Sequence, residues 1–232
     1  MRKKVGFDNG ILDQNGFLQI ASLLETNTCG ALAAAFDEPH GAGVRHLIDH
    51  PSVHNLLRQS SVATLVRETL GDFAFAYKAT LFDKHTEANW LVAWHQDLSI
   101  PVQQRLELEI WTGWSCKEGV LYVQPPTEVL SKLIALRLNL DDCYNNNGPL
   151  RLLTGSHRLG RLQHSDISNY SGHHVEHTVT GLRGDGLLMR PLLIHASSKA
   201  TVEARRRVLH LEFANFDLPD GMDWHRRVAV GS

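Results

Sequence analysis

The second half of the chain alternates short apolar runs with clusters of Gly, Pro and Asn. From residue 73 onward the apolar runs have the length of strands, and polar clusters such as NNNGP, TGSHRLG and GLRGDG separate them. The runs are FAFAYKATLFDK, NWLVAWHQDLSI, GVLYVQPP, IALRLNLDD, LRLLTGSH, HHVEHTVTG, GLLMRPLLIHASS and RRVLHLEFANF. The polar turn HTEA between the first two runs predicts a hairpin, and PTEVLSKL predicts a short helix. This series of short strands predicts an all-β sandwich or barrel.

The first third of the chain has a mixed and then a helical pattern. GFLQIASL predicts a short strand, and TNTCGALAAAF predicts a helix whose first turn Thr26 or Asn27 caps. PSVHNLLRQ begins with Pro51, a residue that the first turn of a helix tolerates. SSVATLVRETLG has a helical stripe of apolar residues, and Gly71 predicts where that helix ends. The chain shows no internal repeat, linker or low-complexity tract, so we expect one domain over residues 1–232. In it, a helical part of about residues 24–71 covers one outer face of a β-barrel core of about residues 73–215.

Composition narrows the class of protein without identifying it. The 232 residues are 43% hydrophobic and 21% charged, which is typical of a globular domain. A formal net charge of −2 argues against a nucleic-acid partner, and no run of 18 apolar residues predicts a membrane span. The basic opening MRKK lacks an apolar segment behind it, so it does not predict a secretory signal. Three scattered cysteines, Cys29, Cys116 and Cys143, fit free thiols, and we expect a cytoplasmic protein.

His95 and Asp97 stand two residues apart in the run NWLVAWHQDLSI. Side chains at positions i and i+2 of a strand point to the same face, whereas Gln96 between them points to the other. Such a pair is either a hydrogen-bonded pair in a polar core or part of a metal site. His195, at the end of the run PLLIH, supplies a second histidine. Two histidines and one carboxylate form the facial triad that holds non-haem Fe(II).

The residues after His195 favour the metal site. Ser197 follows two residues later and Arg206 eleven residues later. A guanidinium fork with a hydroxyl beside it is what the distal carboxylate of 2-oxoglutarate requires. On a strand, Arg206 alternates with Arg205 and Arg207, so the three arginines are not equivalent. A solvated basic face suits Arg205 and Arg207 better than Arg206.

Three blocks of the sequence resemble the signature blocks of the phytanoyl-CoA dioxygenase family. They are FDKHTEANWLVAWHQDLSI, NNNGPLRLLTGSHRLG and IHASSKATVEARRRVLHLEF, and the resemblance covers about residues 70–215. It implies a mainly β fold, the double-stranded β-helix (jelly roll or cupin-like barrel), with N-terminal helices on one face. It also implies Fe(II) bound by His95, Asp97 and His195, with 2-oxoglutarate bound by Arg206 and Ser197.

The same resemblance implies a reaction. An enzyme of this family uses O2 and 2-oxoglutarate as co-substrates, releases succinate and CO2, and hydroxylates a small organic molecule. Related halogenating enzymes have a small residue at the position of Asp97, so the carboxylate favours hydroxylation. The family name does not imply an acyl-CoA substrate here, because no nucleotide-binding motif is present. The identity of the substrate and the oligomeric state stay open.

Several other residues are weaker candidates. Asn89 shares the face of His95 and is either a 2-oxoglutarate ligand or a turn residue. We expect Lys78 and Lys84 at the surface, and Trp111 and Trp114 in the core. Gly148 and Gly155 are expected in turns. A second metal site is not expected at His173, His174 and His177, because no carboxylate or cysteine completes the set.

Two alternatives to this oxygenase are kept. One is a metal enzyme on the same barrel that needs no 2-oxoglutarate, such as a cofactor-independent dioxygenase, although Arg206 and Ser197 would then have no task. The other is a non-catalytic metal-binding barrel or ligand sensor.

Overall fold

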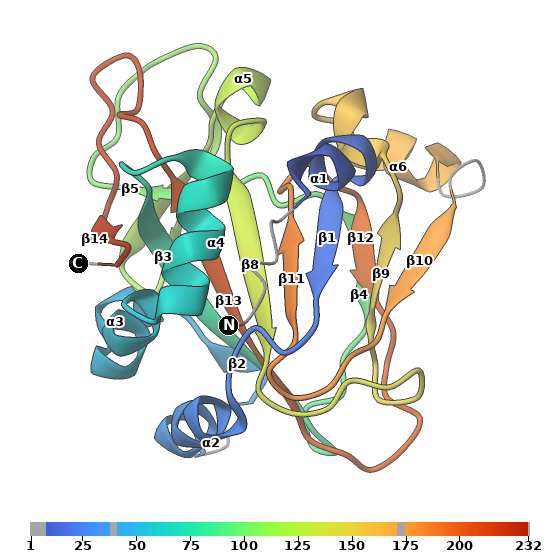
Figure 1. Ribbon diagram of the computed structural model, residues 1–232. Coiled ribbons are helices and arrows are strands. Elements are labelled where there is room, and N and C mark those ends of the chain that lie inside the picture. The colour runs from blue at the N-terminus through green and yellow to red at the C-terminus, as the bar shows by residue number, and fades with distance from the viewer. Residues whose placement is uncertain (1–7, 38–40, 171–174, 232) are drawn as a thin grey trace.

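Two antiparallel sheets form the body of the computed structural model, which describes residues 8–37, 41–170 and 175–231 (Figure 1). In these residues the larger sheet has the strand order β1-β11-β8-β13-β3-β14, with β2 beside β3. Its strands are β1 (Phe17–Ile20), β2 (Gly43–Val44), β3 (Phe75–Lys84), β8 (Ile134–Asn139), β11 (Gly186–Met189), β13 (Arg206–Ala214) and β14 (Val228–Ala229).

The smaller sheet packs against the larger one and has the order β10-β9-β12-β4. Its strands are β4 (Val92–His95), β9 (Leu150–Leu153), β10 (Glu176–Val179) and β12 (His195–Ser197). An apolar cluster joins the two sheets, for example Leu187 and Met189 of β11 with Leu150 and Leu152 of β9. The mainly β jelly-roll prediction is confirmed, although the sheets are not closed into a barrel.

The N-terminal helices cover the outer face of the larger sheet (Figure 1). They are α2 (Thr26–Ala35), the short 3-10 helix η1 (Leu47–Asp49), α3 (Pro51–Leu57) and α4 (Ser60–Leu70). The predicted apolar stripe of α4 is buried against alternate residues of the sheet, among them Leu81 and Leu209. Burying each such side chain contributes roughly 1.5–3 kcal/mol. The amide of Gly71 donates to the carbonyl of Arg67 at 2.7 Å, so α4 ends where the sequence predicts.

The remaining elements lie at the ends of the two sheets. Helix α1 (Asn9–Asn15), which the sequence analysis did not predict, precedes β1, and η2 (Ser156–Leu159) and α6 (His164–Tyr170) follow β9. A third sheet has the order β5-β7-β6, formed by β5 (Ile100–Val102), β6 (Thr112–Lys117) and β7 (Val120–Gln124), and α5 (Thr127–Leu130) comes after it. Trp111 is buried in the core of this part, as expected, whereas Trp114 is half-buried and packs against that core.

The predicted hairpin between β3 and β4 is wrong, because the two strands belong to different sheets. The turn itself forms, and His85 and Ala88 exchange backbone hydrogen bonds of 3.3 and 3.0 Å. However, β13 pairs with β3 along one edge, while β2 and β14 pair with it along the other. Both edges of β3 thus have other partners, and the chain crosses to the smaller sheet at β4.

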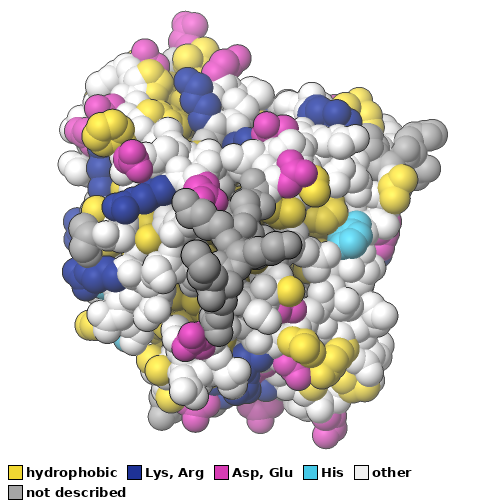
Figure 2. All heavy atoms as spheres, in the orientation of Figure 1, with side chains coloured by type: hydrophobic (Ala, Val, Ile, Leu, Met, Phe, Trp, Pro, Cys, Tyr) yellow, Lys and Arg dark blue, Asp and Glu magenta, His cyan; other side chains and the backbone are white. Residues whose placement is uncertain are grey.

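The surface carries charges of both signs. Figure 2 shows acidic and basic side chains interspersed over the face that carries the helices. None of the helices in the described part of the chain is long and apolar enough to cross a membrane. Cys29 and Cys143 are buried and Cys116 is exposed, and all three are free thiols.

Candidate metal centre

The inner face of the larger sheet is polar where its two central strands meet. The outer residues of β3 and β13 pack under the helices, so the alternate residues point toward the smaller sheet. The inner residues form cross-strand pairs: Lys84 with Arg206, Phe82 with Val208, Thr80 with His210 and Lys78 with Glu212. Buried ionisable groups are costly unless they are paired or used. This row of side chains therefore indicates a functional site.

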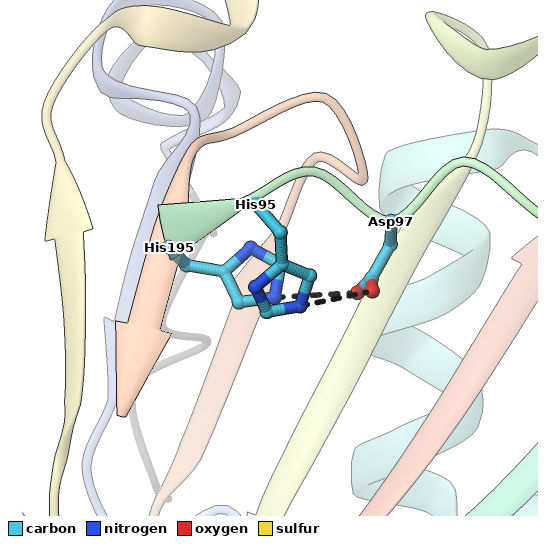
Figure 3. A group of neighbouring side chains, drawn as sticks. All are labelled: His95, Asp97 and His195. Carbon is cyan, nitrogen blue, oxygen red and sulfur yellow. Dashed lines mark ion pairs between the residues drawn. The ribbon is translucent and has the colours of Figure 1, made fainter. Parts of the chain in front are cut away.

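His95, Asp97 and His195 come together opposite this row (Figure 3). His95 ends β4 and His195 begins β12, and the two are directly paired across these antiparallel strands, with ring centroids 4.1 Å apart. Asp97 lies in the loop after β4, where its amide donates to the carbonyl of Pro191 at 2.9 Å. Its carboxylate oxygens lie 3.7 Å from Nε2 of His95 and 3.6 Å from Nε2 of His195. The potential ligand atoms of all three lie within 4.8 Å of one another.

The two imidazoles are oriented for metal binding by the backbone. Nδ1 of His95 lies 2.8 Å from the carbonyl of Ala93, and Nδ1 of His195 lies 2.9 Å from the carbonyl of Leu193. A carbonyl only accepts, so each Nδ1 carries a proton, and in the neutral form of either ring Nε2 is then the nitrogen with the free lone pair. Both Nε2 atoms face the carboxylate of Asp97 (Figure 3). Two imidazoles and one carboxylate are a donor set that fits Fe(II).

The protonation states also suit a metal. Burial lowers the pKa of His195 to about 4, and the opposing effect of Asp97 is smaller. Burial alone would raise the pKa of Asp97, but the neighbouring His195, His210 and His95 outweigh it and hold that pKa well below its usual value. At neutral pH Asp97 is therefore ionised and His195 is neutral, which are the forms that bind metal ions.

Behind the triad lies a buried network of charged and polar side chains. Nε2 of His210 lies 4.0 Å from Asp97 and 3.3 Å from Glu212. Glu212 also pairs with Nζ of Lys78 at 2.6 Å and accepts from the hydroxyl of Tyr77 at 2.8 Å. The expectation that Lys78 lies at the surface is wrong, since its side chain is only 20% exposed. The cause is that β3 is covered on both faces, so its inner lysines are largely shielded from water.

Arg206 and Ser197 line the same cavity as the triad, together with Lys84. Arg206 is buried, and its Nε donates to the carbonyl of Asn147 at 3.2 Å. The hydroxyl of Ser197 donates to the carbonyl of Gly148 at 3.0 Å and accepts from Nζ of Lys84 at 3.1 Å. Lys84 is 1% exposed, so its predicted surface position is also wrong. Burial, with a smaller effect of Arg206, lowers the pKa of Lys84 to about 8.

Gly148 leaves the space that the contact between Lys84 and Ser197 needs, because it has no side chain. Its φ is +77°, and a Cβ would lie 2.7 Å from the carbonyl oxygen of Ser198 and 2.9 Å from Nζ of Lys84. Any other residue would push Lys84 away from Ser197. The turn role expected for Gly148 is confirmed, and Gly155 likewise has a positive φ of +76°.

Arg205 and Arg207 point away from the cavity, as the alternation along the strand predicts. They are not simply solvated, however. Arg205 pairs with Asp83 at 2.8 Å, and Arg207 pairs with Asp141 at 2.8 Å and is buried. Only Arg206 of the three lines the cavity.

The polar side chains beside the triad hold loops in place. Both ends of the Asn89 amide bind the backbone of Ala200, at 2.9 and 2.7 Å, and Asn89 does not line the cavity. Gln96 points away from the triad and binds the backbone of Gly160, Leu162 and Leu192, which fixes the loop that carries Asp97.

Of the three histidines at which no second metal site is expected, His177 lies on β10 and binds Oε1 of Gln19 at 2.7 Å. His173 and His174 lie outside the described residues.

Arg137 is a cavity residue that the sequence analysis missed. It lies on the inner face of β8 beside His210, and it lines the cavity with the triad and Arg206. The sequence does hold a sign of it, because Arg137 is the one charged residue within the apolar run IALRLNL. Only the pairing of β8 with β13, which the sequence does not show, places it next to the metal ligands.

Comparison with known proteins agrees with the fold. The family model for phytanoyl-CoA dioxygenase (PhyH) matches residues 12–208, and the chain belongs to that family. No curated protein sequence matches the chain.

Solved structures share the fold at low sequence identity. EctD from S. alaskensis aligns with a TM-score of 0.71 at 15% identity, covering 99% of this chain and 85% of that one. The non-heme α-ketoglutarate-dependent epimerase SnoN from nogalamycin biosynthesis aligns with a TM-score of 0.66 at 15% identity, covering 95% and 92%. HygX from Streptomyces hygroscopicus, with nickel and 2-oxoglutarate bound, aligns with a TM-score of 0.64 at 16% identity, covering 94% and 88%. At these identities the likeness establishes the fold.

Proposed function

We propose that this protein is an Fe(II)- and 2-oxoglutarate-dependent dioxygenase that hydroxylates a small organic molecule. The observation that carries the proposal is one cavity with two kinds of site. At one place Nε2 of His95 and of His195 face the carboxylate of Asp97, and beside it lie Arg206, Ser197 and Lys84. Membership of the phytanoyl-CoA dioxygenase family supports the same chemistry.

Each side chain has a definite task in this proposal. His95, Asp97 and His195 hold the metal, and Gln96 keeps the Asp97 loop in place. Arg206 binds the distal carboxylate of 2-oxoglutarate with charge-assisted hydrogen bonds, and Ser197 and Lys84 complete that anchor. O2 is the oxidant: Fe(II) held by these residues would activate it, and 2-oxoglutarate, converted to succinate and CO2, would supply two of the four electrons that O2 takes up while the substrate supplies the other two.

The type of oxidation is part of the proposal. The structural neighbours include an epimerase and a carbocyclase as well as EctD, so the fold alone does not define the outcome. Asp97 provides a third protein ligand, which leaves no room for a halide at that position and favours hydroxylation. The cavity is lined in part by Phe82, Trp90, Val92 and Leu150, whose apolar surfaces suit the carbon skeleton of a small substrate.

The experiment is succinate formation from 2-oxoglutarate by the purified protein with Fe(II), a reductant and air. The wild-type protein is expected to release succinate slowly without substrate and faster with a suitable one, whereas Asp97→Ala is expected to release none. Asp97→Glu, which can misplace the metal by roughly 1 Å, is expected to lose about a hundredfold in rate. A wild-type protein that retains Fe(II) but never consumes 2-oxoglutarate would support a non-catalytic metal-binding barrel.

A further inference from the structure

Arg137 is a cation that lines the cavity but belongs neither to the metal triad nor to the proposed 2-oxoglutarate anchor. Its Nη1 lies 3.3 Å from Nδ1 of His210, and its guanidinium carbon lies 5.3 Å from the ring centroid of Phe82. Neither contact supplies a negative charge. Burial, with a smaller effect of Arg206, lowers the pKa of Arg137 to about 10, so the side chain is still charged at neutral pH.

The residues that line the cavity carry more positive than negative charge. Lys84, Arg137 and Arg206 are cations, and Asp97 is the one carboxylate among the described lining residues. None of the three cations forms an ion pair with a carboxylate of the described chain. By contrast, Arg205 and Arg207 on the other face of β13 pair with Asp83 and Asp141. A guanidinium held away from water without an anionic partner is costly, so such a side chain is typical of a site for an anion.

If the function proposed above is correct, the co-substrate 2-oxoglutarate does not neutralise the excess positive charge of the cavity. A divalent metal, three cations and one carboxylate give the cavity a formal charge of +4, which doubly charged 2-oxoglutarate lowers only to +2. Arg206, Ser197 and Lys84 surround the distal carboxylate, and the other end of 2-oxoglutarate belongs to the metal. Arg137 therefore has no oxyanion of its own until a further ligand enters.

A second hollow adjoins the cavity that Arg137 lines. Thr80, His210 and Arg137 form a row across the three adjacent strands β3, β13 and β8. The hydroxyl of Thr80 is buried and has no hydrogen-bond partner in the described structure. Thr80 lines a second hollow, which shares Phe82 and Trp90 with the metal cavity. The two aromatic side chains thus form a common wall between a charged pocket and an adjoining space.

We propose that Arg137 binds an oxyanion group of the primary substrate, so that this enzyme acts on an organic acid. The planar guanidinium matches a carboxylate or a phosphate monoester through paired hydrogen bonds. Phe82 and Trp90 contact the carbon skeleton of the acid. Arg137 is therefore the residue that determines specificity, and it is distinct from Arg206, which serves the co-substrate.

The test uses the full-length protein loaded with Zn(II), which is redox-inert, and 2-oxoglutarate. Dissociation constants are measured by ligand-observed NMR for small carboxylic acids from acetate to 3-phenylpropionate, each beside its primary amide, with phenyl phosphate as a separate arm. The wild-type protein is expected to bind the best acid or the phosphate at least about tenfold more tightly than the matched amide. Whichever anion is preferred identifies the class of acid.

Three variants assign that preference to Arg137. Arg137→Gln is expected to abolish it, and Arg137→Lys, which keeps the charge but lacks the planar fork, to restore part of it. Arg105→Gln is the control for the same change in charge, because Arg105 is exposed and pairs with Glu107. Circular dichroism and thermal unfolding establish that each variant folds.

The possible failures are distinguishable. If the wild-type protein does not bind Zn(II) and 2-oxoglutarate, the proposed function itself fails. If it binds both but prefers no anion over the matched amide, only the inference about Arg137 is overturned. The inference is also overturned if Arg137→Gln weakens 2-oxoglutarate binding as much as Arg206→Ala does, because Arg137 would then belong to the co-substrate site.

Discussion

At the scale of single residues, backbone carbonyls decide which nitrogen of each histidine is free. Ala93 and Leu193 each lie two residues before the histidine that they orient. Both histidines are therefore held by the same local contact, from Nδ1 to the carbonyl of residue i−2. The pairing of His95 with His195 then brings the two Nε2 atoms to one side of the smaller sheet. A metal site follows once the loop after β4 adds Asp97.

This arrangement predicts that His195→Ala abolishes retention of iron while the protein still folds. Removal of one of three protein ligands leaves a site that cannot compete for Fe(II), whereas the imidazole itself contributes little to the apolar core. Iron content after gel filtration, with circular dichroism as the folding check, measures the effect. His177→Ala is the matched control. His177 lies on β10 and is hydrogen-bonded to Gln19, so this variant is expected to keep its iron. A fully loaded His195→Ala variant would contradict the assignment.

The neighbouring arginines of β13 provide a second prediction at this scale. Arg206→Ala is expected to raise the dissociation constant for 2-oxoglutarate at least about tenfold, because charge-assisted hydrogen bonds are each worth roughly 1.5–3 kcal/mol. Iron binding is expected to persist, and Arg206→Lys is expected to recover only part of the affinity.

Arg205→Ala is the control for Arg206→Ala, since Arg205 is engaged with Asp83 and Asp37 on the opposite face. It is expected to lower the free energy of unfolding and to leave 2-oxoglutarate binding unchanged. Isothermal titration calorimetry with each variant separates the two cases. Loss of affinity in Arg205→Ala but not in Arg206→Ala would show that the inner and outer faces of β13 are reversed.

At the scale of elements, Asn89 joins the loop between β3 and β4 to the loop after β12. Its amide makes two hydrogen bonds with Ala200. Asn89→Ala is therefore expected to lower the free energy of unfolding by roughly 1–3 kcal/mol, and to change 2-oxoglutarate affinity less than about threefold. Denaturant unfolding and calorimetry measure the two quantities. If Asn89→Ala weakens 2-oxoglutarate as strongly as Arg206→Ala does, Asn89 is a ligand as well as a loop residue.

The pair of strands β3 and β13 predicts a pH dependence of stability. Burial alone would raise the pKa of Glu212, but Lys78 and His210 outweigh it and lower that pKa to about 2. A carboxylate whose pKa is depressed in the folded state stabilises it above the unfolded pKa, and this contribution is lost as pH falls toward 2. The lowering corresponds to roughly 3 kcal/mol in total.

Glu212→Gln is accordingly expected to flatten the loss of stability between about pH 4.5 and pH 2. Denaturant unfolding at several pH values, for the wild-type protein and the variant, measures the difference. Glu107→Gln removes an exposed carboxylate and is expected to follow the wild-type curve. Parallel curves for Glu212→Gln and the wild-type protein would show that Glu212 does not titrate as the structure implies.

The elements also show what the sequence can and cannot predict. Local patterns placed α2, α4 and most strands within a few residues, because apolar periodicity and a terminal Gly act locally. The order of strands in a sheet is not local, and this explains both the wrong hairpin and the wrong surface positions of Lys78 and Lys84. A lysine in a strand is expected at the surface unless both faces of that strand are known to be covered.

At the scale of the whole molecule, residues of both sheets line the one cavity that holds the candidate site. The metal ligands belong to the smaller sheet and the loop after β4, whereas Arg206, Lys84 and Arg137 belong to the larger sheet. The sequence predicted the jelly roll and the triad together because the family motifs have distinctive spacing over about a hundred residues. It did not predict Arg137, whose role depends on which strand lies beside β8.

The most direct test of the account is a crystal structure of the protein with Fe(II) and 2-oxoglutarate, grown without oxygen. We expect anomalous density for one iron bound by Nε2 of His95, Nε2 of His195 and the carboxylate of Asp97. The distal carboxylate of 2-oxoglutarate is expected on Arg206 and Ser197. Iron bound elsewhere, or 2-oxoglutarate with its distal carboxylate away from Arg206, would contradict the site described here.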